Sequence, residues 1–270
     1  MLTKNIVLYG LSILILKSTS FALVGGDTSG QSNTTAALAQ FSISFNGCTL
    51  TRISRHYFLG AAHCAKSPNG QFGEFHFFYD KSGEKKSNVL SYYRTHSYVD
   101  WTYYIVNDNS YTRPLDIMIY EISNQDIKKL QEISVAKFDF NYSPTVESEI
   151  TLTGYGGYAE IIIGEDNHGN KVYKPIVDDR FRSKRQRITA FNSSYILIPQ
   201  FDQTGAEVRM ARGDSGGAAF NEKFQIIGVN SYVDRKSFAE LVGGIARIDQ
   251  QATSSLGQVQ ISEWLTQFTK

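Results

Sequence analysis

Gly213-Asp214-Ser215-Gly216-Gly217 is the segment that most narrows the choice of fold. Its glycines give Ser215 neighbours without bulk, so a carbonyl group can approach the hydroxyl closely and backbone N–H groups can face it. Such surroundings suit acyl transfer with Ser215 as the nucleophile. The alternative is a glycine-rich turn with an incidental serine, and other parts of the chain must decide between the two.

The order of catalytic residue types along the chain separates the candidate hydrolase classes. The same letters satisfy Gly-x-Ser-x-Gly, the nucleophile elbow of α/β-hydrolases, but those enzymes place the histidine after the serine, whereas the last histidine here is His168. The subtilisin order would need Asp27 ahead of His63, in a sequence without the alternating helices of that fold. The order His, Asp, Ser remains.

His63 has the best context for a general base among the five histidines. It lies in the run Leu59 to Cys64, and a disulfide between Cys64 and Cys48, the only two cysteines, would hold this loop covalently. A general base needs such fixation because its nitrogen must lie within hydrogen-bond reach of the serine oxygen. The other four histidines lack comparable surroundings.

Asp116 is the best candidate for a carboxylate that orients His63 and stabilises its charged form. It precedes the apolar run Ile117 to Ile122, which is typical of a buried strand. Its side chain is therefore expected at the edge of a cleft, where desolvation strengthens a hydrogen bond to His63. A capping role at the strand entrance is the alternative, and Asp100 is a rival that no such run follows.

The first residues indicate export. Lys4 precedes the mostly apolar run Ile6 to Leu16, and Ser20-Phe21-Ala22 offers small residues at the positions that signal peptidase inspects. Residues 1–22 are therefore expected to be a signal peptide and the protein to be secreted, extracellular or periplasmic. The run ends at Lys17, short of the roughly 20 residues that cross a bilayer, so no membrane span is expected after signal removal.

Composition excludes several classes of partner. Lys and Arg number 27 against 26 Asp and Glu, a net charge of +1, so no overall field favours nucleic acid. Neither His-x-x-x-His nor repeated Cys-x-x-Cys occurs, and no metal or cofactor is expected. The basic run 180–187 is compatible with an anionic partner or with a solvated strand whose charges discourage edge-to-edge pairing.

The rest of the chain has an all-β texture of short apolar or alternating runs between Gly, Asn, Asp and Ser clusters. A polar segment between Ile122 and Glu149 indicates a crossing between two β-units, at about 23–135 and 145–258. Residues 154–170 are expected to form a long segment that extends over the surface. At about 259–270, one apolar helical face predicts a C-terminal helix, formed by Ile261, Trp264, Leu265 and Phe268.

In these motifs the chain resembles the trypsin/chymotrypsin family of serine proteases. The resemblance implies two six-stranded antiparallel β-barrels with a C-terminal α-helix, and a secreted, monomeric endopeptidase that acts on protein or peptide substrates and can meet protein inhibitors. It also assigns an oxyanion hole to the N–H groups of Gly213 and Ser215. The matching stretches, in the family's order, are Leu23–Gly26, Cys48 with Leu59–Cys64, Asp116–Ile122, Thr153–Gly156 and Gly213–Gly217.

The resemblance further implies an activation pair, in which a new N-terminus folds inward and its ammonium pairs with the Asp before the nucleophile. Here these residues are Leu23 and Asp214. Family zymogens commonly carry Arg or Lys before the cut, whereas Ala22 occupies that position. We therefore expect signal peptidase to cut between Ala22 and Leu23, with no separate propeptide.

By the same resemblance Arg209, six residues before the nucleophile, lies at the floor of the primary specificity pocket, where trypsin-like members keep Asp. A cation there would repel basic side chains and could accept an acidic one, and Arg212 would add to the positive rim. The wall is expected at Ser231-Tyr232-Val233, where Val233 replaces a common glycine and narrows the entrance. These residues predict a non-tryptic preference, acidic or small aliphatic; the alternative is an outward-facing Arg209 and a shallow neutral pocket.

A rival from another class is a protease-shaped binding or toxin-like module with an unused active site. Decay of a site usually removes a triad member or the oxyanion glycine. Here His63, Asp116, Ser215 and Gly213 are all present, which favours an enzyme.

Overall fold

The computed structural model describes most of the chain after residue 22, and its fold is all-β with a few short helices, as the sequence predicts. The predicted signal peptide and Arg209 lie outside the described residues. Within the described part, no helix is long and apolar enough to cross a membrane. The described residues are 23, 26–28, 31–45, 47–65, 74–79, 85–90, 93–97, 116–157, 159–165, 171–176, 178–199, 210–234, 242–249, 251–254 and 257–270.

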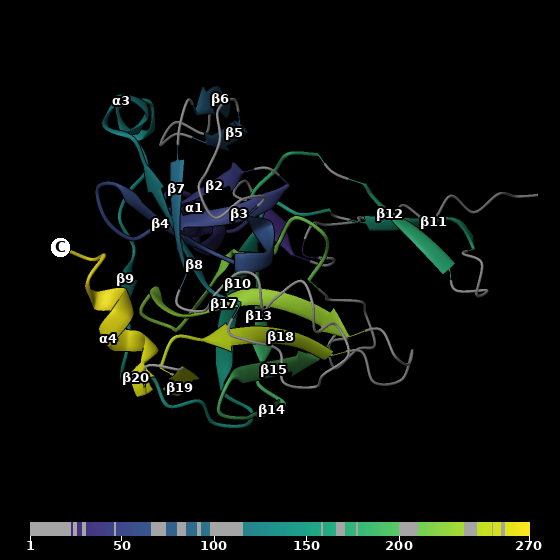
Figure 1. Cartoon of the computed structure of the whole chain (residues 1–270). Coiled ribbons are helices and arrows are strands. Elements are labelled where there is room, and N and C mark those ends of the chain that lie inside the picture. The colour runs from purple at the N-terminus through teal and green to yellow at the C-terminus, as the bar shows by residue number, and fades with distance from the viewer. Residues whose placement is uncertain are drawn as a thin grey trace, which may run out of the picture.

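The first sheet contains seven described antiparallel strands in the order β6-β5-β2-β3-β4-β8-β7 (Figure 1). β2 pairs with β3, β3 with β4, and β5 with β6, so these pairs are neighbours in sequence as well as in the sheet. β8 lies between β4 and β7 and pairs with both. The strands are β2 (Ser42–Phe45), β3 (Cys48–Arg52), β4 (Tyr57–Gly60), β5 (Glu74–Tyr79), β6 (Lys85–Leu90), β7 (Tyr93–Ser97) and β8 (Met118–Ile122).

The second sheet contains nine described strands in the order β1-β13-β10-β16-β17-β18-β15-β14, with β9 added in parallel to β17. Six strands were expected in each half of the chain. The second sheet has three more than that, which are the two-residue strands β1, β9 and β14, and the first sheet has one more. The strands are β1 (Asp27–Thr28), β9 (Lys137–Phe138), β10 (Glu149–Gly154), β13 (Arg182–Arg187), β14 (Ala190–Phe191), β15 (Tyr195–Pro199), β16 (Ala218–Phe220), β17 (Gln225–Asp234) and β18 (Val242–Arg247).

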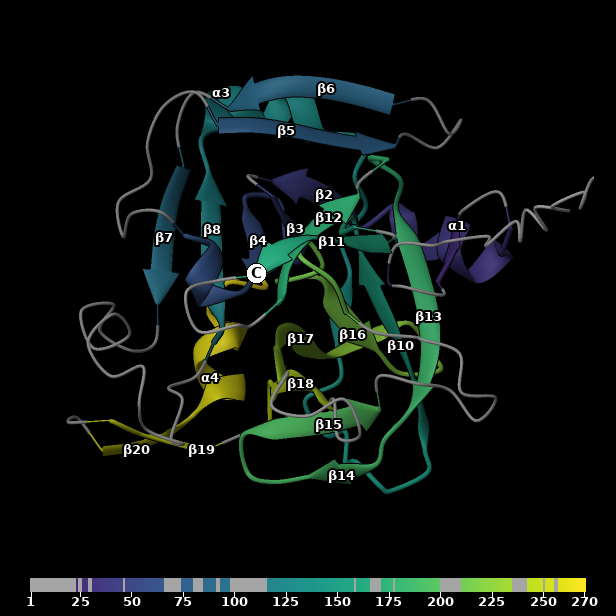
Figure 2. The same cartoon turned by 90° about the vertical axis from the view of Figure 1, so that its right-hand side faces the viewer.

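Two hairpins stand outside both sheets. Among the described strands, β11 (Ala159–Glu165) and β12 (Lys171–Ile176) pair only with each other, and Figure 1 shows them projecting away from the two sheets. In Figure 2, which is viewed from that side, the hairpin overlaps the sheets. The surface segment expected around 154–170 is this hairpin. The second is β19 (Gln251–Ser254) with β20 (Gly257–Gln260), directly before the last helix.

The helices are short and each has a local cause. Ser32 accepts a hydrogen bond from the Thr35 backbone and caps α1 (Asn33–Ala39), which the sequence reading did not anticipate. Ser123 caps α3 (Asn124–Ile127), which continues into η2 (Lys128–Leu130). The predicted C-terminal helix is present as α4 (Ile261–Thr266), and the apolar face named above packs on the main hydrophobic core.

Arg52 ties the connecting segment to the first sheet. It is 7% exposed, and its guanidinium donates to four backbone carbonyls, those of Ser54, Arg55, Leu130 and Ile133. Burial, with a smaller contribution from the charge of Arg55, lowers the pKa of Arg52. The cation thus supplies a donor to the carbonyl of Ile133 and a second donor to that of Leu130, which also accepts from the Ile133 backbone N–H at 3.2 Å.

Candidate functional site

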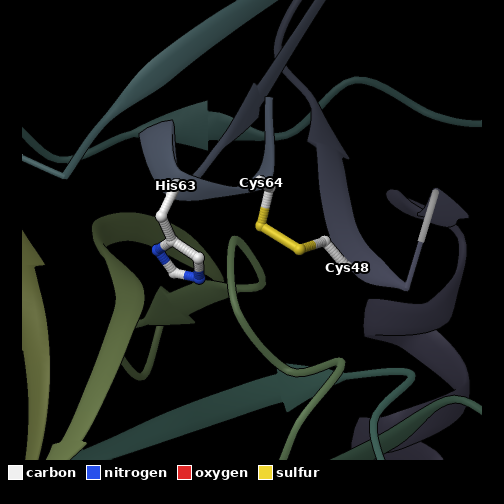
Figure 3. A group of neighbouring side chains, drawn as sticks. All are labelled: Cys48, His63 and Cys64. Carbon is white, nitrogen blue, oxygen red and sulfur yellow. A yellow bond between two sulfur atoms is a disulfide. The ribbon is translucent and has the colours of Figure 1, made fainter. Parts of the chain in front are cut away.

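His63 lies in a single turn of 3-10 helix, η1 (Ala62–Cys64), that follows β4. The predicted disulfide is confirmed, because Cys64 is bonded to Cys48 at the start of β3, with Cα atoms 6.2 Å apart (Figure 3). The bond attaches the turn that carries His63 to the neighbouring strand. The imidazole itself remains 38% exposed, so a substrate can reach it.

Asp116 stands just before β8, is 2% exposed and contacts His63 twice. One carboxylate oxygen accepts from Nδ1 of His63 at 2.7 Å, and the other accepts from the His63 backbone N–H at 3.0 Å. Since a carboxylate can only accept, Nδ1 carries the hydrogen and Nε2 is the acceptor of the ring. The structure therefore sets the tautomer that a general base requires.

Ser231, at the bend of β17, is a third partner in this arrangement. Its hydroxyl donates to Asp116 at 2.6 Å, on the same oxygen that faces Nδ1. Burial by itself would raise the pKa of Asp116, but the hydrogen bonds and charge of His63 and the bond from Ser231 outweigh it, so the pKa lies below its usual range. Asp116 is thus a buried carboxylate that stays ionised.

Ser215 lies against the segment that leads to His63. Its carbonyl oxygen accepts from the backbone N–H of Thr49 at 2.9 Å and lies 3.8 Å from Sγ of Cys64. A β-carbon on Gly216, whose φ is +84°, would meet the backbone N of Ala61 at 2.9 Å, so only glycine allows this approach. The structure therefore brings Ser215 to the same place as His63 and Asp116.

Two backbone N–H groups are available beside Ser215. The φ of Gly213 is +102°, and its carbonyl oxygen accepts from the Thr49 hydroxyl at 2.8 Å, which in turn accepts from the backbone N–H of Tyr155 at 2.9 Å. Within the described part of the chain, the N–H groups of Gly213 and Ser215 have no acceptor. Unsatisfied donors beside a candidate nucleophile are what an oxyanion hole consists of.

A cavity of about 330 Å³ opens beside Ser215. Among the residues assigned to the specificity pocket from the sequence, Arg212, Tyr232 and Val233 line this cavity, and so does Ser231, although its hydroxyl donates to Asp116. The sequence reading placed Ser231 in the pocket wall and missed its bond to Asp116. No local signal marks that bond, because 115 residues separate the partners. The remaining lining residues are Met210, Ala211 and Asn230.

Asp214 is completely buried beneath this cavity. Its carboxylate accepts from the backbone N–H groups of Ala211 at 2.8 Å and Gly156 at 2.9 Å, and from that of Leu23. Burial nevertheless raises the pKa of Asp214 to about 7 against these hydrogen bonds and the nearby charge of Arg182. This carboxylate has too little positive charge around it to ionise as readily as an exposed one.

Leu23 lies inside the second hydrophobic core, 1% exposed, and its backbone N–H donates to Asp214. This contact forms while residue 22 is still bonded to Leu23, so the group that meets Asp214 is a backbone N–H and not an ammonium. The φ of Leu23 is 36°, in the left-handed region that residues with a β-carbon disfavour.

One ring nitrogen of His63 and the sulfur atoms of Cys48 and Cys64 lie within 4.8 Å of one another. Figure 3 shows the three side chains. Both sulfur atoms are committed to the disulfide, and Nδ1 of His63 faces Asp116. Without thiolates this group of residues does not fit a metal ion.

Most of the basic run 180–187 forms β13 (Arg182–Arg187), whose side chains differ in burial between the two faces of the sheet. Arg182 and Gln186 point inward, whereas Arg185 and Arg187 point outward. The outward arginines lie within 3.3 to 3.9 Å of glutamates at 147 and 149. Of the two readings of this run, the solvated strand fits the paired charges better than an anionic partner does.

Residues 24–253 match the model of the trypsin family, so the chain belongs to this family, whose members include trypsin-like serine proteases. A search of curated proteins found no similar sequence. Among solved structures, the chain is similar to mouse neuropsin, a serine protease expressed in the limbic system of the brain, with a TM-score of 0.56 and 14% identity over 86% of this chain and 95% of that one. It is also similar to human heparin binding protein, with a TM-score of 0.55 and 13% identity over 90% and 95% of the two chains. At such identities the likeness concerns the fold.

Proposed function

We propose that the protein is a secreted serine endopeptidase that cleaves peptide bonds through an acyl-enzyme. Membership of the trypsin family supports the class of reaction. The observation that carries the assignment of residues is the hydrogen-bonded chain from Ser231 through Asp116 to His63, beside the backbone of Ser215.

Each residue has a role that its contacts suit. The Ser215 hydroxyl attacks the substrate carbonyl and gives its proton to Nε2 of His63, and the imidazolium formed is stabilised by the ionised Asp116. The N–H groups of Gly213 and Ser215 donate to the oxyanion of the tetrahedral intermediate. His63 then protonates the leaving amine, and water hydrolyses the acyl-enzyme by the same proton transfers in reverse.

Activation is proposed to need a chain that begins at Leu23. Its ammonium would stand where the Leu23 backbone N–H now meets Asp214, and would supply the charge that this buried carboxylate lacks. A chain that begins at Leu23 has no preceding carbonyl, so the left-handed φ ceases to be a constraint. Cleavage by signal peptidase after Ala22 would produce this chain, and the disulfide is consistent with an oxidising compartment.

Specificity is proposed to be non-tryptic. Val233 and the exposed Arg212 line the cavity beside Ser215, which favours acidic or small aliphatic side chains over basic ones. Profiling with a peptide library tests this, with Arg212→Gln and Arg209→Gln as variants that should weaken any acidic preference. Dominant cleavage after Lys or Arg would overturn the proposal.

The test of the activity itself is covalent labelling. Protein that begins at Leu23 should react with a fluorophosphonate probe at Ser215, seen as one added adduct mass, while Ser215→Ala should not react. His63→Ala should slow the labelling strongly, because it removes the general base and leaves the serine in place. Absence of labelling that depends on Ser215, in folded protein with the Leu23 terminus, would favour the non-catalytic binding module.

A further inference from the structure

Arg182 is a buried cation at the start of β13. Its side chain is 2% exposed, and it lies between two strands, opposite Thr28 of β1 on one side and Gly154 of β10 on the other. β1 is the first strand after Leu23. Arg182 therefore lies where the N-terminal segment joins the second sheet.

The register places Arg182 next to Asp214. Directly opposite residues in an antiparallel pair put their side chains on the same face, with β-carbons about 4.5–5.5 Å apart. The partner here is Gly154, and a β-carbon on it would lie 2.0 Å from Oδ1 of Asp214. The Asp214 carboxylate thus occupies the place of the side chain that would pair with Arg182 across the strands. In agreement with this, the charge of Arg182 lowers the pKa of Asp214.

Asp178 holds the guanidinium from the other side. Nη1 of Arg182 donates to one oxygen of Asp178 at 2.7 Å and to the carbonyl of Arg180 at 3.3 Å, and Nη2 donates to the other oxygen of Asp178. The Asp178 side chain is 30% exposed, so water solvates it, whereas none reaches Asp214. The direct contacts of the guanidinium are thus with Asp178, and its charge reaches Asp214 through a buried region where solvent screening is weak.

Other described titratable groups also lie on β1, β10 and β13 and in the segments next to Gly154 and Asp214. Glu149, Arg185 and Arg187 are exposed and Lys184 is partly exposed, and the remaining groups are Tyr155, Arg212 and Asp27. The Tyr155 hydroxyl donates to the carbonyl of Ser42, and the side chains of Arg212 and Asp27 are exposed. None of them offers a buried charge to Asp214.

We infer that Arg182 is a positioning residue for the nucleophile loop, a built-in cation that favours ionisation of Asp214 and so helps to order the loop in chains whose Leu23 is still joined to residue 22. The inference rests on the proposed function. Protein that still carries residues before Leu23 therefore keeps part of its activity. In that protein Arg182 already supplies some of the positive charge near Asp214, and the ammonium of Leu23 adds to it after the cut. The pair with Asp178 limits how much of this charge Asp214 receives.

A cycle of variants in two N-terminal forms tests the inference. One form begins at Leu23 and the other carries an uncleaved extension before Leu23, and kcat/KM on a peptide substrate is measured for wild type, Arg182→Met and Arg182→Lys. We expect Arg182→Met to lower the activity of the extended form by about tenfold or more and that of the Leu23 form by only about threefold, with Arg182→Lys restoring most of the loss. In the extended form, the pH below which activity falls should rise by about one unit in Arg182→Met and stay in place in Arg182→Lys.

Asp178→Asn gives a second test at a partly exposed position, in case Arg182→Met does not fold. Releasing the guanidinium from Asp178 should raise the activity of the extended form by about threefold and leave the Leu23 form nearly unchanged. Equal losses in both forms from Arg182→Met, or no gain from Asp178→Asn, would show that Arg182 only supports the sheet.

Unfolding separates a failure of this inference from a failure of the proposed function. If no form hydrolyses peptides or reacts with the probe, the proposed function fails, yet urea unfolding of the extended form across pH still reports the ionisation of Asp214. Arg182→Met, or Asp178→Asn with the opposite sign, should then shift that pH dependence by about one unit. An unshifted pH dependence would overturn the inference whatever the activity.

Discussion

Asp116→Asn keeps the volume of the side chain and changes what it can accept. Asp116 accepts three hydrogen bonds, at 2.7 and 3.0 Å from His63 and 2.6 Å from Ser231. An asparagine has one acceptor oxygen. If this oxygen keeps the bond to the His63 backbone, the amide NH2 faces Nδ1, which must then be the unprotonated nitrogen. The proton moves to Nε2, which can no longer take a proton from Ser215.

The expected loss follows from this exchange of tautomers. A wrong tautomer with otherwise intact geometry costs about 10⁴ in kcat, which corresponds to about 5.5 kcal/mol of barrier. The structure supports a loss of this size because Asp116 is 2% exposed, so no water can replace the missing acceptor. Ser231→Ala is the matched control. It removes one hydrogen bond to the same carboxylate and leaves the tautomer unchanged, and it should cost only about tenfold.

The assay is hydrolysis of a chromogenic peptide ester by protein that begins at Leu23, with thermal unfolding of each variant measured in parallel. A folded Asp116→Asn protein that retains more than about a tenth of the wild-type rate would refute the reasoning, since Asp116 would not be the group that sets the tautomer of His63.

Three further results are expected. In a chain that extends before Leu23, the pKa of Asp214 is raised from 3.8 to about 7, so the folded state binds more protons than the unfolded state between these values, and the free energy of unfolding falls as the pH rises through them. Urea unfolding at pH 5 and pH 8 should show a loss on the order of 2 to 3 kcal/mol for that chain beyond any shown by a chain that begins at Leu23; equal losses would speak against the pairing with the ammonium. Arg52→Met should lower the free energy of unfolding by about 3 kcal/mol, because it removes four hydrogen bonds to backbone carbonyls, and a urea-derived change below about 1 kcal/mol would contradict this. Replacing Cys48 and Cys64 together by Ala should cost about 3 kcal/mol in a thermal melt and reduce hydrolysis even while the protein is folded; unchanged activity would mean that η1 is positioned without the bond.

The sequence was sufficient to predict the family and to name the residues of the candidate site, because chain order and local composition carry that information. His63 beside a cysteine, Asp116 before an apolar run and Ser215 among glycines are all local signals, and the structure places them side by side. The disulfide could be predicted equally well, since two cysteines allow only one pairing.

What the sequence did not reveal depends on contacts between distant strands. The bond from Ser231 to Asp116 has no local pattern, and the register that sets Arg182 opposite Gly154 appears only once β10 and β13 are aligned. The basic run containing Arg182 looked uniform in sequence, and the sheet separates it into inward and outward side chains. By contrast, α1 had a readable signal in Ser32 before an alanine-containing run, which we overlooked.

Thr49 makes the two sheets depend on each other. Standing on β3 of the first sheet, it holds the carbonyls of Gly213 and Ser215 and the backbone N–H of Tyr155, all of which belong to the second half of the chain. A sliding of one sheet over the other by about 1 Å would break these contacts, because hydrogen bonds weaken steeply beyond about 3.2 Å. The nucleophile loop would then lose its alignment with His63 while each sheet was still intact. Mild denaturant or pressure should accordingly abolish the activity of the protein before it unfolds, and restoring the contact between the two sheets should be enough to recover the activity.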